Sequence, residues 1–190
     1  MGKVMYAMSV SIDGFIEAPD GDIGWSAPSE ELHKHFNDLE RMIDIHLYGR
    51  RLYENMAAYW PTADENPTAP EHEIAYARIW KEMPKIVFSK TLDRVGWNSR
   101  LIRGSIAEEV NKLKAQPGLS MSVGGAEIAS AFMRLGLIDE YRLYYHPIIL
   151  GGGKPAFRQL PNKINLQLVE THTFDIGVVL LRYQLVKGRK

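Results

Sequence analysis

The chain of 190 residues contains no cysteine. Disulfide bonds, thiol nucleophiles and cysteine-ligated metal sites are therefore excluded together. The six histidines show neither an H-E-x-x-H motif nor another paired spacing that would place two imidazoles on one metal ion, so we expect no metal centre. Net charge is also missing, because 23 basic side chains balance 23 acidic ones. This balance argues against nucleic acid or an anionic membrane as a partner.

Long apolar runs are absent as well, since none approaches the roughly 20 residues that a membrane-spanning helix needs. The first residues lack the order of basic, apolar and small residues that marks a secretory signal, and we expect a cytoplasmic protein. What the chain does contain is 45% apolar and 24% charged residues, which is typical of a globular protein. Its length predicts one domain over residues 1–190.

Predicted strands and helices alternate through two thirds of the chain, and predicted strands then follow one another directly. The expected strands cover residues 3–12, 45–48, 85–88, 120–123, 141–150, 165–173 and 178–186. The expected helices cover residues 29–43, 50–56, 71–82, 105–113 and 126–135, and the proline-rich residues 59–70 are expected to form a loop. This order predicts an α/β fold, a three-layer α/β/α sandwich with a mostly parallel sheet and an antiparallel C-terminal edge.

One segment joins an apolar run to a predicted helix through two adjacent glycines, and it reads Val123-Gly124-Gly125-Ala126-Glu127-Ile128. Without Cβ atoms, the backbone at Gly124 and Gly125 lets a ligand approach closely, and the free N–H groups of the helix start point toward it. The helix dipole adds partial positive charge there, which suits an anion such as a pyrophosphate. The alternative is a tight turn that binds no ligand. The segment is also not the G-x-G-x-x-G motif that marks dinucleotide binding in doubly wound folds.

Two further segments follow predicted strands and carry cationic side chains. Gly49 precedes Arg50 and Arg51 at a predicted helix start, where the helix dipole disfavours cations and a bound phosphate would account for them. Ser89-Lys90-Thr91 offers two hydroxyls and an ammonium group just past another strand, which suits a second phosphate. The structural alternative for Arg50 and Arg51 is that they are solvated surface arginines. The alternative for Ser89-Lys90-Thr91 is a turn capped by a side-chain hydroxyl.

These segments stand in a particular order with others along the chain. The full set is Asp13-Gly14-Phe15-Ile16, Gly49-Arg50-Arg51-x-Tyr53-Glu54, Ser89-Lys90-Thr91-Leu92, Gly124-Gly125, Asp139-Glu140 and Pro147-Ile148-Ile149-Leu150-Gly151. Their joint order and spacing resemble the dihydrofolate-reductase-like superfamily, and specifically the free-standing relatives of the reductase domain from bacterial riboflavin biosynthesis. The resemblance spans nearly the whole chain.

The resemblance implies a reductase that uses NADPH and transfers hydride to a C=N or C=O bond of a small heterocyclic or carbonyl substrate, such as a pterin or a ribosylaminouracil-like compound. On this resemblance the cofactor's pyrophosphate is held by the glycine turn and the amides after it, namely Gly124, Gly125, Ala126, Glu127 and Ile128. The adenosine side with its 2′-phosphate is bound by Gly49, Arg50, Arg51, Ser89, Lys90 and Thr91. The nicotinamide is walled by Ala7 and Ile16. The hydride chemistry itself belongs to the cofactor.

A proton must accompany the hydride, and two carboxylates are candidates for the catalytic donor. Asp13 lies beside the first strand, and Glu30 lies near the start of the first predicted helix. Glu31 and His33 are close to Glu30, so the donor's position in that helix stays open. The structural alternatives are an Asp-Gly turn for Asp13 and a complement to the helix dipole for Glu30.

Aromatic side chains suit the flat face of a heterocycle, and Trp25 and Trp60 are the expected walls of the substrate site. The alternative function on the same fold is a module that binds a dinucleotide or a sugar phosphate without turning it over. A carboxylate or a water path that reaches the site would favour the reductase over the binding module, because the reductase needs a source of protons. The long C-terminal strands also predict a homodimer, because exposed sheet edges need a cover.

Overall fold

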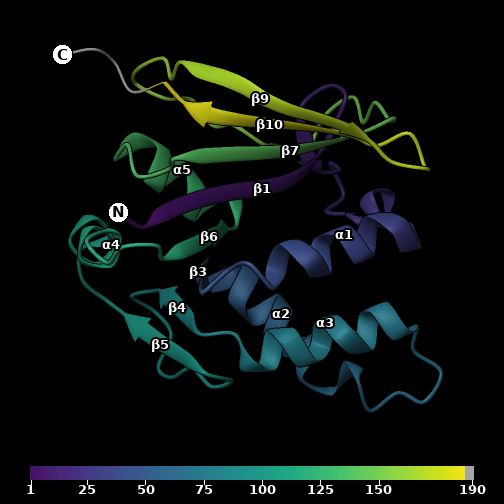
Figure 1. The fold of residues 1–190 in the computed structure, drawn as a ribbon, viewed down its shortest axis with the longest axis horizontal. Coiled ribbons are helices and arrows are strands. Elements are labelled where there is room, and N and C mark those ends of the chain that lie inside the picture. The colour runs from purple at the N-terminus through teal and green to yellow at the C-terminus, as the bar shows by residue number, and fades with distance from the viewer. Residues whose placement is uncertain (187–190) are drawn as a thin grey trace.

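The computed structural model describes residues 1–186, which form one large sheet, a small two-stranded sheet, five α-helices and one 3₁₀ helix (Figure 1). The elements in chain order are β1 (Lys3–Ser11), β2 (Phe15–Glu17), η1 (Gly24–Ser26), α1 (Glu30–Glu40), β3 (Ile45–Gly49), α2 (Arg50–Ala63), α3 (Glu71–Glu82), β4 (Lys85–Phe88), β5 (Ser99–Ile102), α4 (Ile106–Lys114), β6 (Ser120–Gly124), α5 (Ala126–Arg134), β7 (Glu140–His146), β8 (Lys154–Pro155), β9 (Leu166–Thr173) and β10 (Val179–Leu185). None of the helices described is both long enough and apolar enough to cross a bilayer.

The large sheet has the strand order β5-β4-β3-β6-β1-β7-β10-β9. The strands from β5 to β7 in this order pair in parallel, whereas β10 pairs antiparallel with both β7 and β9. The mostly parallel sheet with an antiparallel C-terminal edge is therefore confirmed. Because parallel strands end at the same edge of a sheet, the turns after β1, β3, β4, β6 and β7 all lie at one edge, where ligands bind in folds of this class.

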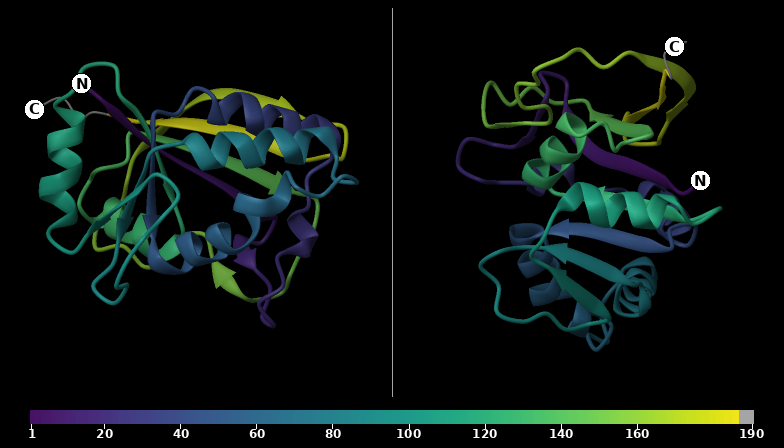
Figure 2. Two further views of the ribbon diagram at one scale, coloured as in Figure 1. Left: turned by 90° about the horizontal axis from the view of Figure 1, so that it is seen from below. Right: turned by 90° about the vertical axis from the view of Figure 1, so that its left-hand side faces the viewer.

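Helices cover both faces of this sheet (Figure 2), and the side chains of β1 alternate between the two faces. Val4 and Tyr6 point to the face of α4 and α5, where they join the core that contains Phe132. Met5 points to the opposite face and packs with Leu39 of α1. Helix α3 packs against both α1 and α2 on that face. The three-layer α/β/α arrangement predicted from the sequence is thus confirmed.

Several features of the fold differ from the sequence prediction. The loop expected over residues 59–70 begins only after Ala63, because α2 continues with Pro61 in its last turn. Trp60 lies in the same turn and packs against Tyr76 of α3, and the proline removes only one hydrogen bond from the helix there. β7 ends at His146, directly before a proline that has no N–H group for the sheet, and does not continue to residue 150. The pairing of β2 with β8 was not predicted, since it joins segments far apart in the chain.

Candidate functional site

Two helices begin side by side at the carboxyl edge of the sheet. Helix α2 follows β3 at Gly49, and α5 follows β6 at Gly125; β3 and β6 are neighbouring parallel strands. A Cβ atom at Gly49 would lie 3.3 Å from Cβ of Ile128, and one at Gly124 would lie 2.6 Å from Cδ2 of Leu52. A side chain at either position would therefore crowd Ile128 of α5 or Leu52 of α2, and these neighbours would have to move. The glycines bring the two N-termini together.

The first turns of α2 and α5 have no side-chain cap within the described part of the chain. Their N-cap residues are Gly49 and Gly125, and Gly125 has φ 98°, a conformation that favours glycine. By contrast, the side chains of Ser29 and Ser105 accept first-turn N–H groups of α1 and α4. Uncapped N–H groups and two neighbouring helix dipoles suit an anion. This edge of the sheet therefore contains a candidate anion-binding site.

A cavity of about 500 Å³ lies beside the start of α2 and is lined by three cationic side chains, Arg51, Lys154 and Arg158. Lys154 lies 3.4 Å from Glu17, and Arg158 lies 3.2 Å from Glu127. Arg51 forms no ion pair with any residue in the range 1–186. Guanidinium groups are well suited to bind phosphate oxygens, so the cavity extends the candidate anion site away from the glycine turn.

Of the three cations that line this cavity, only Arg51 stands at a position that the sequence marks, in the Gly49-Arg50-Arg51 run at a helix start. Lys154 follows three glycines, but Pro155 stands where a P-loop needs Ser or Thr, so no local pattern marked it. Arg158 lies in a loop that only the tertiary structure brings to α2. Arg50, predicted together with Arg51, is exposed and lies 4.0 Å from Glu54 of the same helix.

Ser89 begins a capped turn after β4. Its hydroxyl oxygen accepts the backbone N–H groups of Thr91 and Leu92, each at 3.1 Å. The guanidinium group of Arg103 donates to the backbone carbonyl oxygens of Lys90, at 3.1 Å, and of Leu92. The hydroxyl is thus used within the turn, as in the structural alternative, while the side chain of Lys90 is exposed to solvent.

The two predicted proton donors both have structural contacts. The carboxylate of Asp13 accepts the Ser11 hydroxyl at 2.6 Å and the N–H of Gly151 at 2.7 Å, and so joins two loops at the carboxyl edge. The hydrogen bond from Ser11 lowers the pKa of Asp13, which keeps this carboxylate ionised at neutral pH. Glu30 pairs with Lys34 at 2.7 Å on the exposed side of α1. These contacts favour the structural alternatives for both residues.

The predicted substrate walls have different surroundings. Trp25 in η1 lies edge to face with His146 at the end of β7, with ring centroids 5.5 Å apart. Trp60 packs against Tyr76 in the contact between α2 and α3, with centroids 4.3 Å apart. His33 lies between α1 and α3, where burial lowers its pKa. Trp25 is therefore the predicted wall that the structure places at the carboxyl edge.

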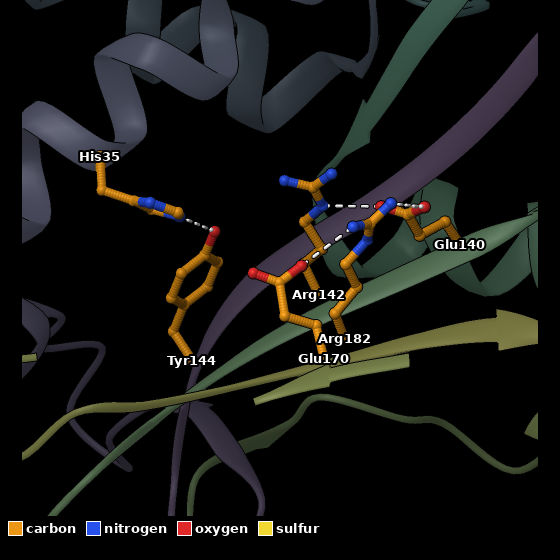
Figure 3. Close-up of polar contacts among 6 residues, drawn as sticks. All are labelled: His35, Glu140, Arg142, Tyr144, Glu170 and Arg182. Atoms are coloured by element: carbon orange, nitrogen blue, oxygen red, sulfur yellow. Dashed lines mark hydrogen bonds and ion pairs between the residues drawn. The ribbon is translucent and has the colours of Figure 1, made fainter. Parts of the chain in front are cut away.

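The two predicted nicotinamide contacts lie on opposite sides of the large sheet. Ala7 packs on the side of α1 with Tyr144, whose hydroxyl group forms a 2.9 Å hydrogen bond with Nε2 of His35 (Figure 3). Ile16 packs with Val10 in a cluster on the other side. The structure does not bring Ala7 and Ile16 into one cluster, so a ring held by both would lie across the edge of the sheet.

A charged network that sequence analysis did not detect lies on the α1 side of β7, β9 and β10 (Figure 3). Oε1 of Glu140 accepts Nε of Arg142 at 2.7 Å and Nε of Arg182 at 2.9 Å. Oε2 of Glu140 accepts Nη2 of Arg182 at 3.0 Å, and Nη1 of Arg182 donates to Glu170 at 2.9 Å. The network joins three strands that are distant in sequence.

The sequence model of the protein family described as the RibD C-terminal domain matches residues 2–180 of the chain. The chain belongs to the RibD C-terminal domain family. This RibD C-terminal domain is 37% identical over 185 residues to the uncharacterized protein YyaP of Bacillus subtilis (strain 168), covering 95% of this chain and 94% of that protein.

Two solved structures have the same fold as this RibD C-terminal domain. A putative riboflavin biosynthesis protein from Shewanella sp. PV-4 superposes with a TM-score of 0.77 at 20% identity, over 97% of this chain and 99% of that one. The dihydrofolate reductase of Enterococcus faecalis, complexed with NADP(H), superposes with a TM-score of 0.63 at 13% identity, over 96% of both chains. The resemblance and the dihydrofolate-reductase type of fold are therefore confirmed.

Proposed function

We propose that this RibD C-terminal domain is an NADPH-dependent reductase that transfers hydride to a C=N or C=O bond of a small heterocyclic or carbonyl substrate. The observation that carries the proposal is the combination of two uncapped helix N-termini with an adjacent cationic cavity. A pyrophosphate with a neighbouring phosphate fits this combination, because free N–H groups bind one anion and guanidinium groups bind the next. The NADP(H) complex of the Enterococcus faecalis reductase, which shares the fold, supports this choice of cofactor.

The residues predicted for the pyrophosphate and for the adenosine side each have a task in this proposal. The pyrophosphate lies against the glycine turn and the first amides of α5, which are those of Gly124, Gly125, Ala126, Glu127 and Ile128. Arg51, with Lys154 and Arg158 beside it, neutralises a phosphate in the cavity. The adenosine side is flanked by Gly49, Arg50, Ser89, Lys90 and Thr91. Bound NADPH supplies the hydride, and the protein binds and orients the reactants.

Calorimetric titration of the purified protein with NADPH and with NADH tests the cofactor. Arg51→Met is expected to weaken NADPH binding about tenfold or more, because a hydrogen bond to a charged group contributes about 1.5–3 kcal/mol, and to weaken NADH binding less. The control is Arg78→Met, at an exposed arginine on α3. Equal losses for both cofactors would contradict the role of Arg51. A folded protein that binds neither nucleotide would overturn the proposal.

A module that binds a dinucleotide or a sugar phosphate without turnover is the second candidate. The contacts of Asp13 and Glu30 favour this candidate. Both carboxylates are held by structural partners, and neither has the raised pKa expected of a proton donor. Their catalytic roles stay predictions. Loss of NADPH absorbance in the presence of a pterin or an aminouracil separates the two candidates. Oxidation that depends on the added compound supports the reductase, and binding without oxidation supports the module.

We also propose that β9 pairs with β9 of a second copy of the chain. β9 is an edge strand of the large sheet that residues 1–186 form, and its Leu168 and Val169 are 49% and 43% exposed. An eight-residue edge strand without proline or lysine is open to further pairing. Light scattering is expected to give a dimer for the native chain and a monomer for Val169→Lys. Leu135→Lys, at another exposed apolar side chain, is expected to leave the dimer intact; a monomeric native chain would contradict the proposal.

A further inference from the structure

One carboxylate joins the helix starts to the cationic cavity. Within residues 1–186, the first turns of α2 and α5 contain a single acidic side chain, that of Glu127 in α5. Its Oε1 atom lies 3.2 Å from Nη2 of Arg158, which lines the cavity. A helix start and a guanidinium group are also what a phosphate group binds. Glu127 therefore pairs, inside the chain, with a group that the proposed cofactor needs.

The three cations of the cavity differ in how they are held. Arg51 forms no ion pair within residues 1–186, and Lys154 pairs with Glu17, which lines the same cavity. Arg158 pairs with Glu127, and these two side chains are 46% and 63% exposed. Water screens so exposed an ion pair, which then contributes little to stability. Arg158 is therefore the cation of the cavity whose partner is most easily exchanged.

The backbone that carries Arg158 is fixed by the two residues before it. The N–H of Ala156 donates to the carbonyl oxygen of Gly14 at 2.9 Å, and Ala156 is buried. The ring of Phe157 lies edge to face with Tyr6, with ring centroids 6.3 Å apart. A change of partner at Arg158 therefore requires only a rotation of its exposed side chain, and the backbone can stay in place.

Another wall of the cavity belongs to a loop that contains two further carboxylates. Pro19 of this loop lines the cavity, and the hydrogen bonds of residues 19–28 all stay within residues 18–28. The carboxylate of Asp20 accepts the N–H of Asp22, and that of Asp22 accepts the N–H of Gly24. The loop is self-contained, and its carboxylates serve its own backbone. They leave Glu127 as the competitor for Arg158.

We propose that Arg158 exchanges partners when the nucleotide binds, leaving the carboxylate of Glu127 for a phosphate group. Glu127 is thus an internal anion that competes with the cofactor. Two parallel hydrogen bonds from a guanidinium group to a phosphate are stronger than the exposed ion pair that they replace, so the exchange favours binding. The released carboxylate is exposed and becomes hydrated. The inference rests on the proposed cofactor function and names the residue that limits the affinity of that site.

Calorimetric titration with NADPH and with inorganic pyrophosphate tests the exchange. Glu127→Gln keeps the size of the side chain but removes its charge. It is expected to tighten the binding of both probes about threefold to fivefold, because an exposed ion pair holds its partners by a factor of this order. In about 1 M salt, where the Debye length is about 3 Å, the native chain and the variant are expected to differ by less than about twofold.

A double-mutant cycle shows whether Glu127 acts through Arg158. Arg158→Met is expected to weaken NADPH binding about tenfold. Adding Glu127→Gln to Arg158→Met is expected to change the affinity by less than about twofold, because the carboxylate then has no guanidinium group to hold. The control is Glu71→Gln, which removes an exposed first-turn carboxylate of α3 that does not line the cavity. It is expected to leave the affinity unchanged.

The exchange is supported if the gain from Glu127→Gln requires Arg158. It is overturned if Glu127→Gln gains nothing, if it gains the same factor with and without Arg158, or if neither probe binds. An equal gain in both backgrounds would mean that the carboxylate acts by repulsion alone. Pyrophosphate binding that depends on Glu127, without NADPH binding, would keep the exchange and overturn the cofactor. NADPH binding without that dependence would do the reverse.

Discussion

Replacing Gly153 with alanine is expected to destabilise the protein by about 3 kcal/mol and to abolish measurable NADPH binding. Gly153 has φ 123°, which residues with a side chain rarely adopt, and a Cβ atom there would lie 2.0 Å from the carbonyl oxygen of Glu17. That oxygen belongs to the backbone of β2 and cannot rotate away as a side chain would, so the pairing of β2 with β8 must break. One wall of the cationic cavity would be lost with it.

The adjacent glycine provides the control for this prediction. A Cβ atom at Gly152 would have Cγ of Pro19 as its nearest neighbour, at an ordinary distance of 3.6 Å. Gly152→Ala is therefore expected to change the free energy of unfolding by less than about 0.5 kcal/mol. Chemical denaturation and calorimetric titration of both variants measure the two effects. If Gly153→Ala were as stable as Gly152→Ala and still bound NADPH, the contact between β2 and β8 would not shape the cavity.

Glu140→Gln is expected to destabilise the protein by about 3 kcal/mol, because it leaves two partly buried guanidinium groups without their shared carboxylate. Glu140 is 7% exposed and accepts hydrogen bonds from both Arg142 and Arg182 (Figure 3). Glu170→Gln is the control, since Glu170 is largely exposed and contacts only the outer side of Arg182. Exposed ion pairs contribute at most about 1 kcal/mol, so a much smaller effect is expected there.

The same network predicts a dependence of stability on pH. Burial alone would raise the pKa of Glu140, but the hydrogen bonds from Arg182 and Arg142 outweigh burial and hold it below its ordinary value of 4.5. The stabilisation is therefore complete above pH 4.5 and is lost as the pH falls through the lower pKa of the folded state. Denaturation curves of the native chain and of Glu140→Gln are expected to converge in acid. If the difference in the free energy of unfolding between the two proteins stayed constant as the pH fell below 4.5, the assigned role of the carboxylate would be contradicted.

Patterns between neighbours in the chain are enough to predict most of this fold. The strand-to-helix turn at Gly124-Gly125 and the two consecutive C-terminal strands are confirmed, because each depends on a few adjacent residues. Pro61 shows the limit. It removes a hydrogen bond from α2, which predicts an end of the helix, but α2 continues to Ala63, and Trp60 of the same turn packs against Tyr76 of α3.

The candidate site is less accessible to sequence reasoning, since it is assembled from contacts between distant segments. The turn at Gly124-Gly125 can be predicted, because two adjacent glycines stand between an apolar run and a helical pattern. Lys154 and Arg158 belong to a later loop that meets α2 only in the folded protein, and neither stands in a motif. Site residues that stand in no sequence motif can be recognised by the cavity that they line and by the ion pairs that they form. Cavities and ion pairs are known only from a structure.

The self-contained loop over residues 19–28 has a consequence for how this protein can diverge. Since its hydrogen bonds close within residues 18–28, substitutions there break no bond of the sheet, and the loop can change by mutation at little cost to folding. The glycines at 49 and 124 have no such freedom, because α2 and α5 pack directly against them. Descendants of one ancestor can therefore vary in the loop while they inherit an unchanged arrangement of the two helix starts that form the proposed nucleotide site.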